Sequence, residues 1–332
     1  MNIQILTPAP PGSRAGNRAT AERWQRLLEG AGHRVSVLTE LSQSPCDLFI
    51  ALHAWRSREA IATIRQTHPA VPVITALTGT DIYHHQQEYP RETRRSMELA
   101  DALIGLHTLV EKDIPREYRS RLVTVLQSAE DICEPEIQPL PRGDDENFFD
   151  VCVIGHLRDE KDSLRAARAC QHLSPDSRIR ITNAGKAHNR EWQTRAETEQ
   201  AGNPRFRWLG ELGATETRAL MARSRLMVIS SVMEGGANVV SEACRAGLPI
   251  LASDIPGNRG LLGADYPGYF RVRDDRHLAE LLSRAEHSPA FLAQLRRHVT
   301  QKAALFVPEA EQAALLSAIA MAITNSRARI TP

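Results

Sequence analysis

The sequence predicts an α/β protein with two domains, each a doubly wound parallel sheet. Short apolar runs of strand length alternate with segments of helical periodicity along the chain. The 332 residues are more than one ordinary domain requires. Residues 134–147 are rich in proline and acidic side chains and lack periodicity, so we expect an interdomain linker there. The predicted domains cover residues 1–140 and 141–307, followed by a helical segment over 308–332.

The composition argues against several classes of protein. Lys and Arg number 41 against 40 Asp and Glu, a net charge of +1, which argues against nucleic acid as the main partner. The five cysteines are scattered and form no C-x-x-C pair, as is typical of a reducing compartment. The chain opens directly into a predicted strand, and no apolar stretch approaches the length of a membrane span. We therefore expect a cytoplasmic protein with neither a signal peptide nor a membrane span.

In the first domain, predicted strands alternate with predicted helices, the pattern of a parallel sheet. The predicted strands cover residues 2–7, 34–38, 47–52, 71–77, 102–105 and 123–126. Helical spacing of apolar residues predicts helices over 18–29, around Ile61 and Ile64, and over 92–100. A Pro/Gly loop, 8–17, joins the first strand to the first helix.

That loop favours an anion site over a dinucleotide site. Gly12 and Gly16 lack the G-x-G-x-x-G spacing of a dinucleotide fingerprint. Arg14 and Arg18 flank the glycines, so the loop offers positive charge beside exposed backbone.

Polar residues follow the first, third and fourth predicted strands. The loops after these parallel strands are expected to lie on one rim of the sheet, where α/β proteins bind ligands. The candidates to bind a small anion there are Arg14, Asn17, Arg18, His53, Arg56 and Thr80. The alternative for His53 and Arg56 is an ordinary solvated loop. The alternative for the Thr80-Asp81 pair is a helix cap with Asp81 as the N-cap residue.

The second domain continues the alternation of strands and helices. The predicted strands cover residues 150–154, 180–185, 206–210, 226–229 and 250–252. Gly247 and Pro249 end a predicted helix over 238–246. A last amphipathic helix is predicted from Glu309 to about Thr324.

The loop after residues 226–229 carries two carboxylates and a glycine pair. Glycines let a ligand approach the main chain, and the free N–H groups at the start of a helix suit a phosphate. The candidates to bind a diphosphate through these groups are Gly235, Gly236, Ala237, Asn238 and Val239. Glu242, one turn into the helix, can accept hydrogen bonds from a ribose, and Glu234 from an attached sugar. The alternative is a solvated surface helix after a glycine-rich turn.

A second charged loop follows the strand over 150–154. Arg158 and Lys161 are spaced to clamp a pyrophosphate, Arg with its fork and Lys as a point charge. The alternative is a solvated helix start in which Asp159 and Glu160 offset the two cations.

Both loops resemble motifs of the retaining glycosyltransferases with the GT-B fold. Glu234, seven residues and Glu242, followed by a Gly-x-Pro stop, resemble the nucleotide-sugar motif of that family. Gly155 to Lys161 resembles its Gly-Arg-Leu-x-x-x-Lys motif, in which Lys161 matches but His156 stands at the Arg position. The resemblance implies two Rossmann-like domains facing a cleft and a C-terminal helix that crosses back to the first domain.

The resemblance also implies roles for residues. Lys161 would stabilise the leaving diphosphate, and either Arg158 takes over the missing Arg role or His156 acts in a new way. Glu242 would hold the ribose and Glu234 the sugar hydroxyls. No Asp-x-Asp motif stands where a metal would hold the diphosphate, so we expect neither a metal nor a cofactor.

Further segments resemble one subgroup, the selenosugar synthases of the selenoneine pathway. These segments are LTGTDIY, VLQSAE, GHLRDEKD, EGGANVVSEA and GNRGLLGADYPGYF. The resemblance implies transfer of the hexose of a UDP-sugar, with UDP-N-acetylglucosamine favoured, to selenophosphate, with release of UDP and phosphate. A selenophosphate synthetase and a selenoneine synthase would be the functional partners. Transfer to a hydroxyl acceptor, epimerisation of a nucleotide sugar, and non-catalytic sensing of a nucleotide sugar stay open as alternatives.

Overall fold

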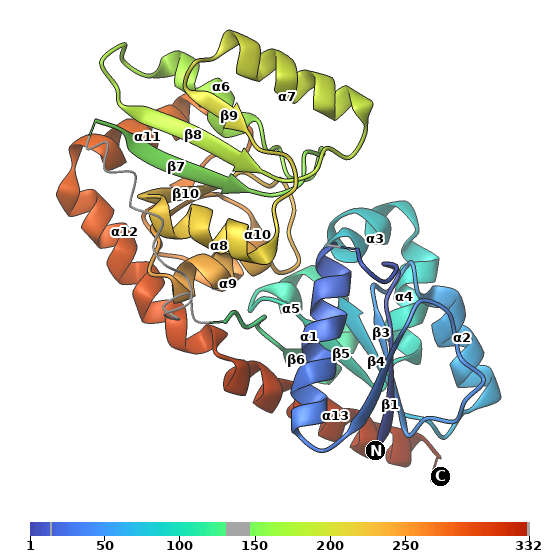
Figure 1. Cartoon of the computed structure of the whole chain (residues 1–332). Helices are drawn as coiled ribbons and strands as arrows, with labels where there is room; N and C mark the ends of the chain where they lie inside the picture. Colours follow the sequence, from blue (N-terminus) through green and yellow to red (C-terminus); the bar gives the residue numbers. More distant parts are fainter. Residues whose placement is uncertain (14, 131–146, 331–332) are drawn as a thin grey trace. The chain divides into compact units, whose positions relative to one another are not determined.

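The computed structural model describes residues 1–13, 15–130 and 147–330, which form two compact units (Figure 1). The predicted α/β class is confirmed in both units. The predicted linker lies outside the described residues except for Asn147. Unit 1 comprises Met1–Ser128, Glu234–Asn238 and Val307–Pro332, and unit 2 comprises Ala129–Met233 and Val239–Phe306.

Unit 1 contains a six-stranded sheet in the order β2-β1-β3-β4-β5-β6, and all its strands are parallel. The six predicted strands are all present, with small shifts at their ends. Central strands β3 and β4 are buried at every residue because helices cover both faces. The strands are β1 (Asn2–Leu6), β2 (Arg34–Leu38), β3 (Leu48–Leu52), β4 (Val73–Leu77), β5 (Ala102–Gly105) and β6 (Leu122–Thr124).

Helices α1 and α13 cover one face of this sheet, and α2 and α4 cover the other. The C-terminal helix α13 therefore belongs to unit 1, as the GT-B resemblance implied. The helices are α1 (Gly16–Gly30), α2 (Arg58–Thr67), α3 (Gln86–Glu88), α4 (Pro90–Leu99), α5 (Val110–Asp113) and α13 (Pro308–Ile330), with a π-helical turn η1 (Asp81–His85) and a 3-10 turn η2 (Arg116–Arg121).

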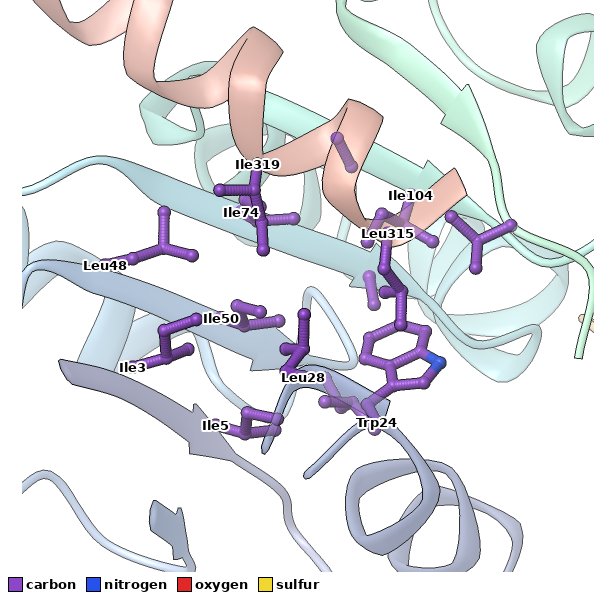
Figure 2. Packing of buried hydrophobic residues seen from close by; sticks show 14 of the residues in the cluster. Ile3, Ile5, Trp24, Leu28, Leu48, Ile50, Ile74, Ile104, Leu315 and Ile319 are labelled. Carbon is purple, nitrogen blue, oxygen red and sulfur yellow. The ribbon is translucent and has the colours of Figure 1, made fainter. Parts of the chain in front are cut away.

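The core beneath α1 and α13 joins the two ends of the chain. Trp24 and Leu28 of α1 meet Leu315 and Ile319 of α13 over the apolar face of the strands (Figure 2). All four side chains are at most 3% exposed. Burial of such side chains is worth about 1.5–3 kcal/mol each, so α13 is an integral part of unit 1.

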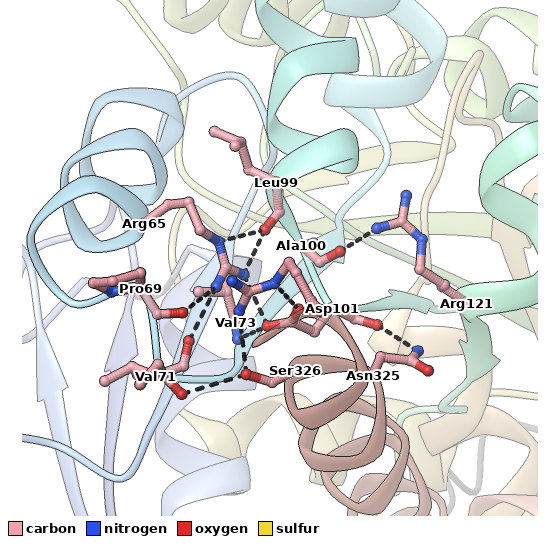
Figure 3. Close-up of polar contacts among 12 residues, drawn as sticks. Arg65, Pro69, Val71, Val73, Leu99, Ala100, Asp101, Arg121, Asn325 and Ser326 are labelled. Carbon is pink, nitrogen blue, oxygen red and sulfur yellow. Dashed lines mark hydrogen bonds and ion pairs between the residues drawn. The ribbon is translucent and has the colours of Figure 1, made fainter. Parts of the chain in front are cut away.

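Asp101 holds the last turns of α13, which extend past the predicted helix end. The Asp101 carboxylate accepts hydrogen bonds from Arg65 Nη2 at 2.8 Å, Val73 N–H at 2.9 Å and Arg329 Nε at 3.1 Å. Asn325 Nδ2 donates to its carbonyl at 2.8 Å (Figure 3). These contacts explain the extra length, because the polar residues that end α13 are bound to the sheet rather than left in solvent.

Glu311 fixes the first turn of the same helix. Its carboxylate is fully buried and accepts hydrogen bonds from Trp24 Nε1 at 2.7 Å, Arg23 Nε at 2.8 Å and Ser128 N–H at 2.6 Å. A buried carboxylate is tolerated only when it is paired and hydrogen-bonded. Glu311 therefore ties α13 to α1 and to the segment that leaves β6.

A hydrogen-bonded chain of three side chains lies beside β5. His107 is buried, and its Nδ1 accepts the Leu109 N–H at 3.1 Å, so the ring carries its proton on Nε2. Nε2 lies 2.8 Å from the Tyr83 hydroxyl, which donates to Asp113 Oδ2 at 2.8 Å. Burial lowers the pKa of His107 to about 4. The neutral ring is thus a structural part of unit 1.

Unit 2 contains a second six-stranded parallel sheet, in the order β12-β11-β10-β7-β8-β9. The five predicted strands are present, and two-residue β12 was too short to predict. The strands are β7 (Phe149–Ile154), β8 (Ile179–Ala184), β9 (Phe206–Trp208), β10 (Leu226–Ile229), β11 (Ile250–Ser253) and β12 (Tyr269–Phe270). The helical segments are α6 (Arg165–Ala169), η3 (Cys170–His172), α7 (Arg190–Gly202), α8 (Ala214–Arg223), α9 (Asn238–Arg245), α10 (Pro256–Leu262), α11 (Asp275–His287), α12 (Pro289–Lys302) and η4 (Ala303–Phe306).

In the part of the chain that the structure describes, no single helix has the length and apolar character needed to cross a membrane. The segments Pro289–Phe306 and Pro308–Ile330 meet that test only as a pair, which is bent by 51°.

The substitution Glu311→Ala is expected to lower the free energy of unfolding by about 3 kcal/mol or more, because it leaves the Arg23 guanidinium and the Trp24 N–H without their buried acceptor. Urea unfolding followed by tryptophan fluorescence measures this change. Glu309→Ala, at an exposed position of the same turn, is the control and should have little effect. Equal loss in both variants would contradict the proposed role of Glu311.

The buried neutral ring of His107 predicts a pH dependence of stability. Between pH 6.5 and about 4 the unfolded chain binds a proton that the folded state excludes. The stabilisation is therefore complete above pH 6.5 and is lost as the pH falls towards 4. In His107→Gln, the free energy of unfolding should fall less steeply across this range, by up to about 1.4 kcal/mol per pH unit. Equal slopes for the wild type, this variant and the exposed-site control His68→Gln would contradict the prediction.

Candidate functional site

In unit 1, the predicted anion-binding residues follow the carboxyl ends of three neighbouring parallel strands, β1, β3 and β4. Asn17 and Arg18 lie in the first turn of α1, His53 follows β3 directly, and Thr80 follows β4. His53 Nε2 and Thr80 Oγ1 are 2.9 Å apart, so the structure brings these two side chains together. Arg14 lies outside the described residues.

Asp81 connects the loops at this edge. Its fully buried carboxylate accepts hydrogen bonds from the N–H groups of Ala54 and Thr78, each at 2.9 Å, and Gly79 at 2.8 Å. It therefore ties the loop after β3 to the loop after β4. The N-cap interpretation is wrong, because Thr80 occupies the N-cap position and the Asp81 carboxylate turns back towards the strand ends.

His53 is buried and lies in the left-handed region of the backbone, with φ of 76°. This conformation is uncommon outside glycine and is concentrated at functional sites. His53 Nδ1 accepts the Arg56 N–H at 3.2 Å, so the proton is on Nε2, which donates to Thr80 Oγ1. Burial lowers the pKa of His53 to about 4, an effect that Asp81 opposes and the Arg56 charge increases. His53 is therefore a neutral donor near pH 7, and the solvated-loop interpretation is wrong for this residue.

The two described arginines of this edge differ in their surroundings. Arg18 is only 11% exposed, and its Nε pairs with Glu22 at 2.6 Å. Its Nη1 is buried and has no hydrogen-bond partner among the described residues. An unpaired buried donor is costly, so this nitrogen suits an anion. The Arg56 side chain is exposed, as the solvated-loop alternative has it.

The glycine loop Glu234–Asn238 groups with unit 1 by its contacts. A Cβ on Gly235 would lie 2.3 Å from the Thr78 carbonyl carbon, and one on Gly79 would lie 2.4 Å from Gly235 N. Gly79 also has φ of +110°. Both positions therefore require glycine. Glu234 is buried, with only 8% of the residue exposed.

The main chain of this loop offers hydrogen-bond donors. Within residues 1–13, 15–130 and 147–330, the N–H groups of Gly235, Gly236 and Ala237 have no hydrogen-bond partner. Asn238 and Val239 begin helix α9, whose first N–H groups have no acceptor within the helix. The main chain of residues 235–239 therefore offers five consecutive N–H donors.

In unit 2, the loop after β7 lies against the segment after β10, because these strands are neighbours. Val232 N–H donates to the Glu160 carbonyl at 2.9 Å. Ser230 Oγ lies 2.9 Å from the Asp162 carbonyl and 3.2 Å from the Lys161 carbonyl. The structure therefore places Lys161 beside the strand end that leads into the glycine loop.

The loop after β8 supports the same edge. His156 Nδ1 accepts the Lys186 N–H at 3.1 Å, so the neutral ring carries its proton on Nε2. A Cβ on Gly185 would lie 1.9 Å from the Gly155 carbonyl oxygen, so only glycine allows these loops to touch. Arg158 Nε is 3.7 Å from Glu160, beyond hydrogen-bond distance. Its charge is therefore only partly offset by Glu160.

Helix α9 carries Glu242 in its second turn. Val240, Ala243 and Cys244 form the buried face of the helix, whereas Glu242 is half-buried. Among the described residues, no group of three or more His, Cys, Asp or Glu side chains is arranged to hold a metal ion.

Three contributors to these edges were missed from the sequence. Asp81 was visible as a polar residue after a strand, but its partners in another loop were not. Ser230 and the buried Gln127 gave no signal, because each bonds to backbone groups that are distant in the sequence.

Solved structures with the same architecture include glycosyltransferases. HepE from Anabaena in complex with UDP superposes with a TM-score of 0.77 at 16% identity, covering 96% of this chain and 100% of that chain. Sucrose-phosphate synthase from Thermosynechococcus elongatus gives 0.77 at 14%, covering 97% and 99%. A glycosyltransferase from Rickettsia africae gives 0.73 at 12%, covering 98% and 99%. This chain therefore has the GT-B fold.

The sequence also matches a family model. Residues 134–306, more than half of the chain, match the model described as glycosyl transferases group 1. That range contains the charged loop after β7 and the glycine loop. The chain belongs to the group 1 glycosyltransferases.

Proposed function

We propose that this glycosyltransferase is a selenosugar synthase, which transfers the hexose of UDP-N-acetylglucosamine to selenophosphate. The bond between the anomeric carbon and the diphosphate oxygen breaks, UDP leaves, and a bond from the anomeric carbon to selenium forms. Water then cleaves the Se–P bond, which releases phosphate and the selenosugar. The family membership supports the transfer, and the selenium acceptor rests on the resemblance of five segments to selenosugar synthases.

The donor would be held by residues 234–242, which run from the glycine loop into helix α9. Glu242 would accept hydrogen bonds from the ribose hydroxyls, and Glu234 from the hydroxyls of the transferred sugar. The five N–H groups from Gly235 to Val239 would bind the diphosphate. HepE, which has the same fold, was crystallised with UDP, and this supports a UDP-sugar as the donor.

Two cations and a histidine would act on the leaving group. Lys161 and Arg158 would neutralise the charge that develops on UDP, an effect worth several kcal/mol when the groups are already in place. His156 carries its proton on Nε2 and would donate a hydrogen bond where related enzymes have an arginine. No metal or cofactor is part of the proposal.

The structural observation that supports an anionic acceptor is the hydrogen bonding of the His53 ring. Both its ring nitrogens are engaged, one accepting from Arg56 N–H and one donating to Thr80. In this arrangement neither ring nitrogen is free to accept a proton from a hydroxyl acceptor. Selenophosphate needs no base because it is already ionised.

The same edge offers donors for an anion. The Thr80 hydroxyl accepts from His53, so its own hydrogen is directed elsewhere. Arg18 Nη1 is a buried donor without a partner in the described residues. We propose that these groups, with Asn17, Arg14 and the exposed Arg56, bind the selenophosphate.

The proposal also places the enzyme in a sequence of reactions. A selenophosphate synthetase would supply the acceptor, and a selenoneine synthase would consume the selenosugar, all in the cytoplasm. These partners follow from the proposed reaction, which consumes selenophosphate and releases a selenosugar.

Incubation of the protein with UDP-N-acetylglucosamine and selenophosphate is expected to yield UDP and a selenium-containing sugar, detected by mass spectrometry, and EDTA should not reduce the rate. UDP release only with a hydroxyl acceptor would show an ordinary glycosyltransferase. Interconversion of UDP-sugars without an acceptor would show an epimerase. Binding without any turnover would show a sensor. Each of these results would overturn the proposal.

Lys161→Ala is expected to lower kcat by roughly 100-fold, because a cation that stabilises the leaving group is lost. Glu242→Ala is expected to raise the Kd of UDP by roughly 10- to 100-fold, because its charged hydrogen bonds to the ribose are lost. Steady-state kinetics measures kcat, and titration calorimetry measures the Kd of UDP. Lys112→Ala and Glu111→Ala, at exposed positions, are the controls. Near-normal values for either site variant would show that the donor site is misplaced.

A further inference from the structure

Gln127 is a buried side chain next to the glycine loop and has no role in the proposed chemistry so far. It follows β6, is 2% exposed, and lies within unit 1 between helix α1 and the loop Glu234–Asn238. Gly236 allows this approach, because a Cβ there would lie 2.5 Å from Leu106 Cβ and 3.0 Å from the Gln127 amide.

The neighbours of the Gln127 amide decide its orientation. On one side lie two acceptors, the Gly236 carbonyl at 2.8 Å and Asn238 Oδ1 at 3.2 Å. On the other side lie Arg23 Nη2, a donor, at 3.0 Å and the Thr20 hydroxyl at 2.5 Å, whose single hydrogen can go to Gln127 or to the Gly16 carbonyl 2.8 Å away. The amide nitrogen therefore faces the loop and the amide oxygen faces α1, because the opposite orientation sets the amide oxygen against the Gly236 and Asn238 oxygens and the amide nitrogen against Arg23 Nη2.

The bond to the Gly236 carbonyl also sets the direction of the next N–H group. In a trans peptide the carbonyl oxygen and the following N–H point in opposite directions, and none of the described peptide bonds is cis. With the Gly236 carbonyl turned to Gln127, the Ala237 N–H points away from Gln127. That N–H has no hydrogen-bond partner in the described part of the chain.

We propose that Gln127 is a positioning residue that fixes the Gly236–Ala237 peptide plane and so aims the Ala237 N–H at an anionic ligand. The identity of that ligand as the diphosphate of the donor rests on the proposed function. The orientation of the peptide itself does not, and it can be measured without any ligand. Because the plane is fixed before the ligand arrives, the N–H does not have to reorient as charge develops on the leaving group.

Two substitutions separate positioning from packing. Gln127→Glu keeps the size and shape and still accepts from Arg23, so the contact with α1 is kept. However, a carboxylate cannot donate to the Gly236 carbonyl and would repel it. Gln127→Leu removes both the donor to the Gly236 carbonyl and the acceptor for Arg23. Gln87→Glu, the same chemical change at an exposed position of unit 1, is the control.

Hydrogen exchange of the loop peptide in the absence of ligand tests the positioning directly. In Gln127→Glu the amides around Ala237 should exchange at least several-fold faster than in the wild type, while the melting temperature falls less than in Gln127→Leu. Unchanged exchange in this variant would overturn the inference. Faster exchange accompanied by a fall in melting temperature as large as that of Gln127→Leu would also overturn it, because the role would then be structural only.

The affinity for UDP and the turnover rate test whether this peptide orientation matters for binding and catalysis. The Kd of UDP should rise about 10-fold in Gln127→Glu, and kcat should fall further, by roughly 100-fold, because the N–H acts most strongly on the leaving group. Wild-type affinity and rate in this variant would overturn the inference. If the wild-type protein itself bound no UDP, the proposed donor would be wrong, and the exchange experiment would still decide the role of Gln127.

Discussion

Parallel pairing in both sheets is the constraint on which the rest of the structure depends. When all strands run the same way, every loop after a strand emerges at the same edge. The residues with unusual chemistry are found there, with His53 and Thr80 after β3 and β4 in unit 1, and Lys161 and Glu242 after β7 and β10 in unit 2. The helices cover the faces of the sheets, and the candidate site residues lie on the segments that follow the strands.

Buried carboxylates hold this arrangement together. Asp81 collects N–H groups from two loops, Asp101 joins α2 and α13 to the sheet, and Glu311 joins α13 to α1. A carboxylate is costly to bury, so each of these sites is stable only while all its donors are in place. Because each carboxylate needs all its donors, it also fixes the positions of the segments that carry them. Asp81 in particular fixes the positions of the loops that carry His53 and Thr80.

Close backbone contacts give the loops their second constraint. Gly79 meets Gly235, and Gly185 meets Gly155, at distances that exclude any Cβ. A loop held in this way keeps its N–H groups free of side chains. In the proposed reaction the enzyme must stabilise charge on a leaving nucleotide, and donors fixed in advance do so most effectively.

The sequence by itself determined the α/β class, nearly every strand, and the spacing of Glu234, the glycine pair and Glu242, because periodicity and glycine placement are local properties of the chain. It also indicated which loops would share an edge. Only the tertiary structure decided that Asp81 anchors two loops instead of capping a helix, that His53 is a neutral donor, and that Gln127 contacts Gly236. These contacts join residues far apart in sequence, and the partner of a buried polar group depends on which distant segments the packed sheet brings beside it.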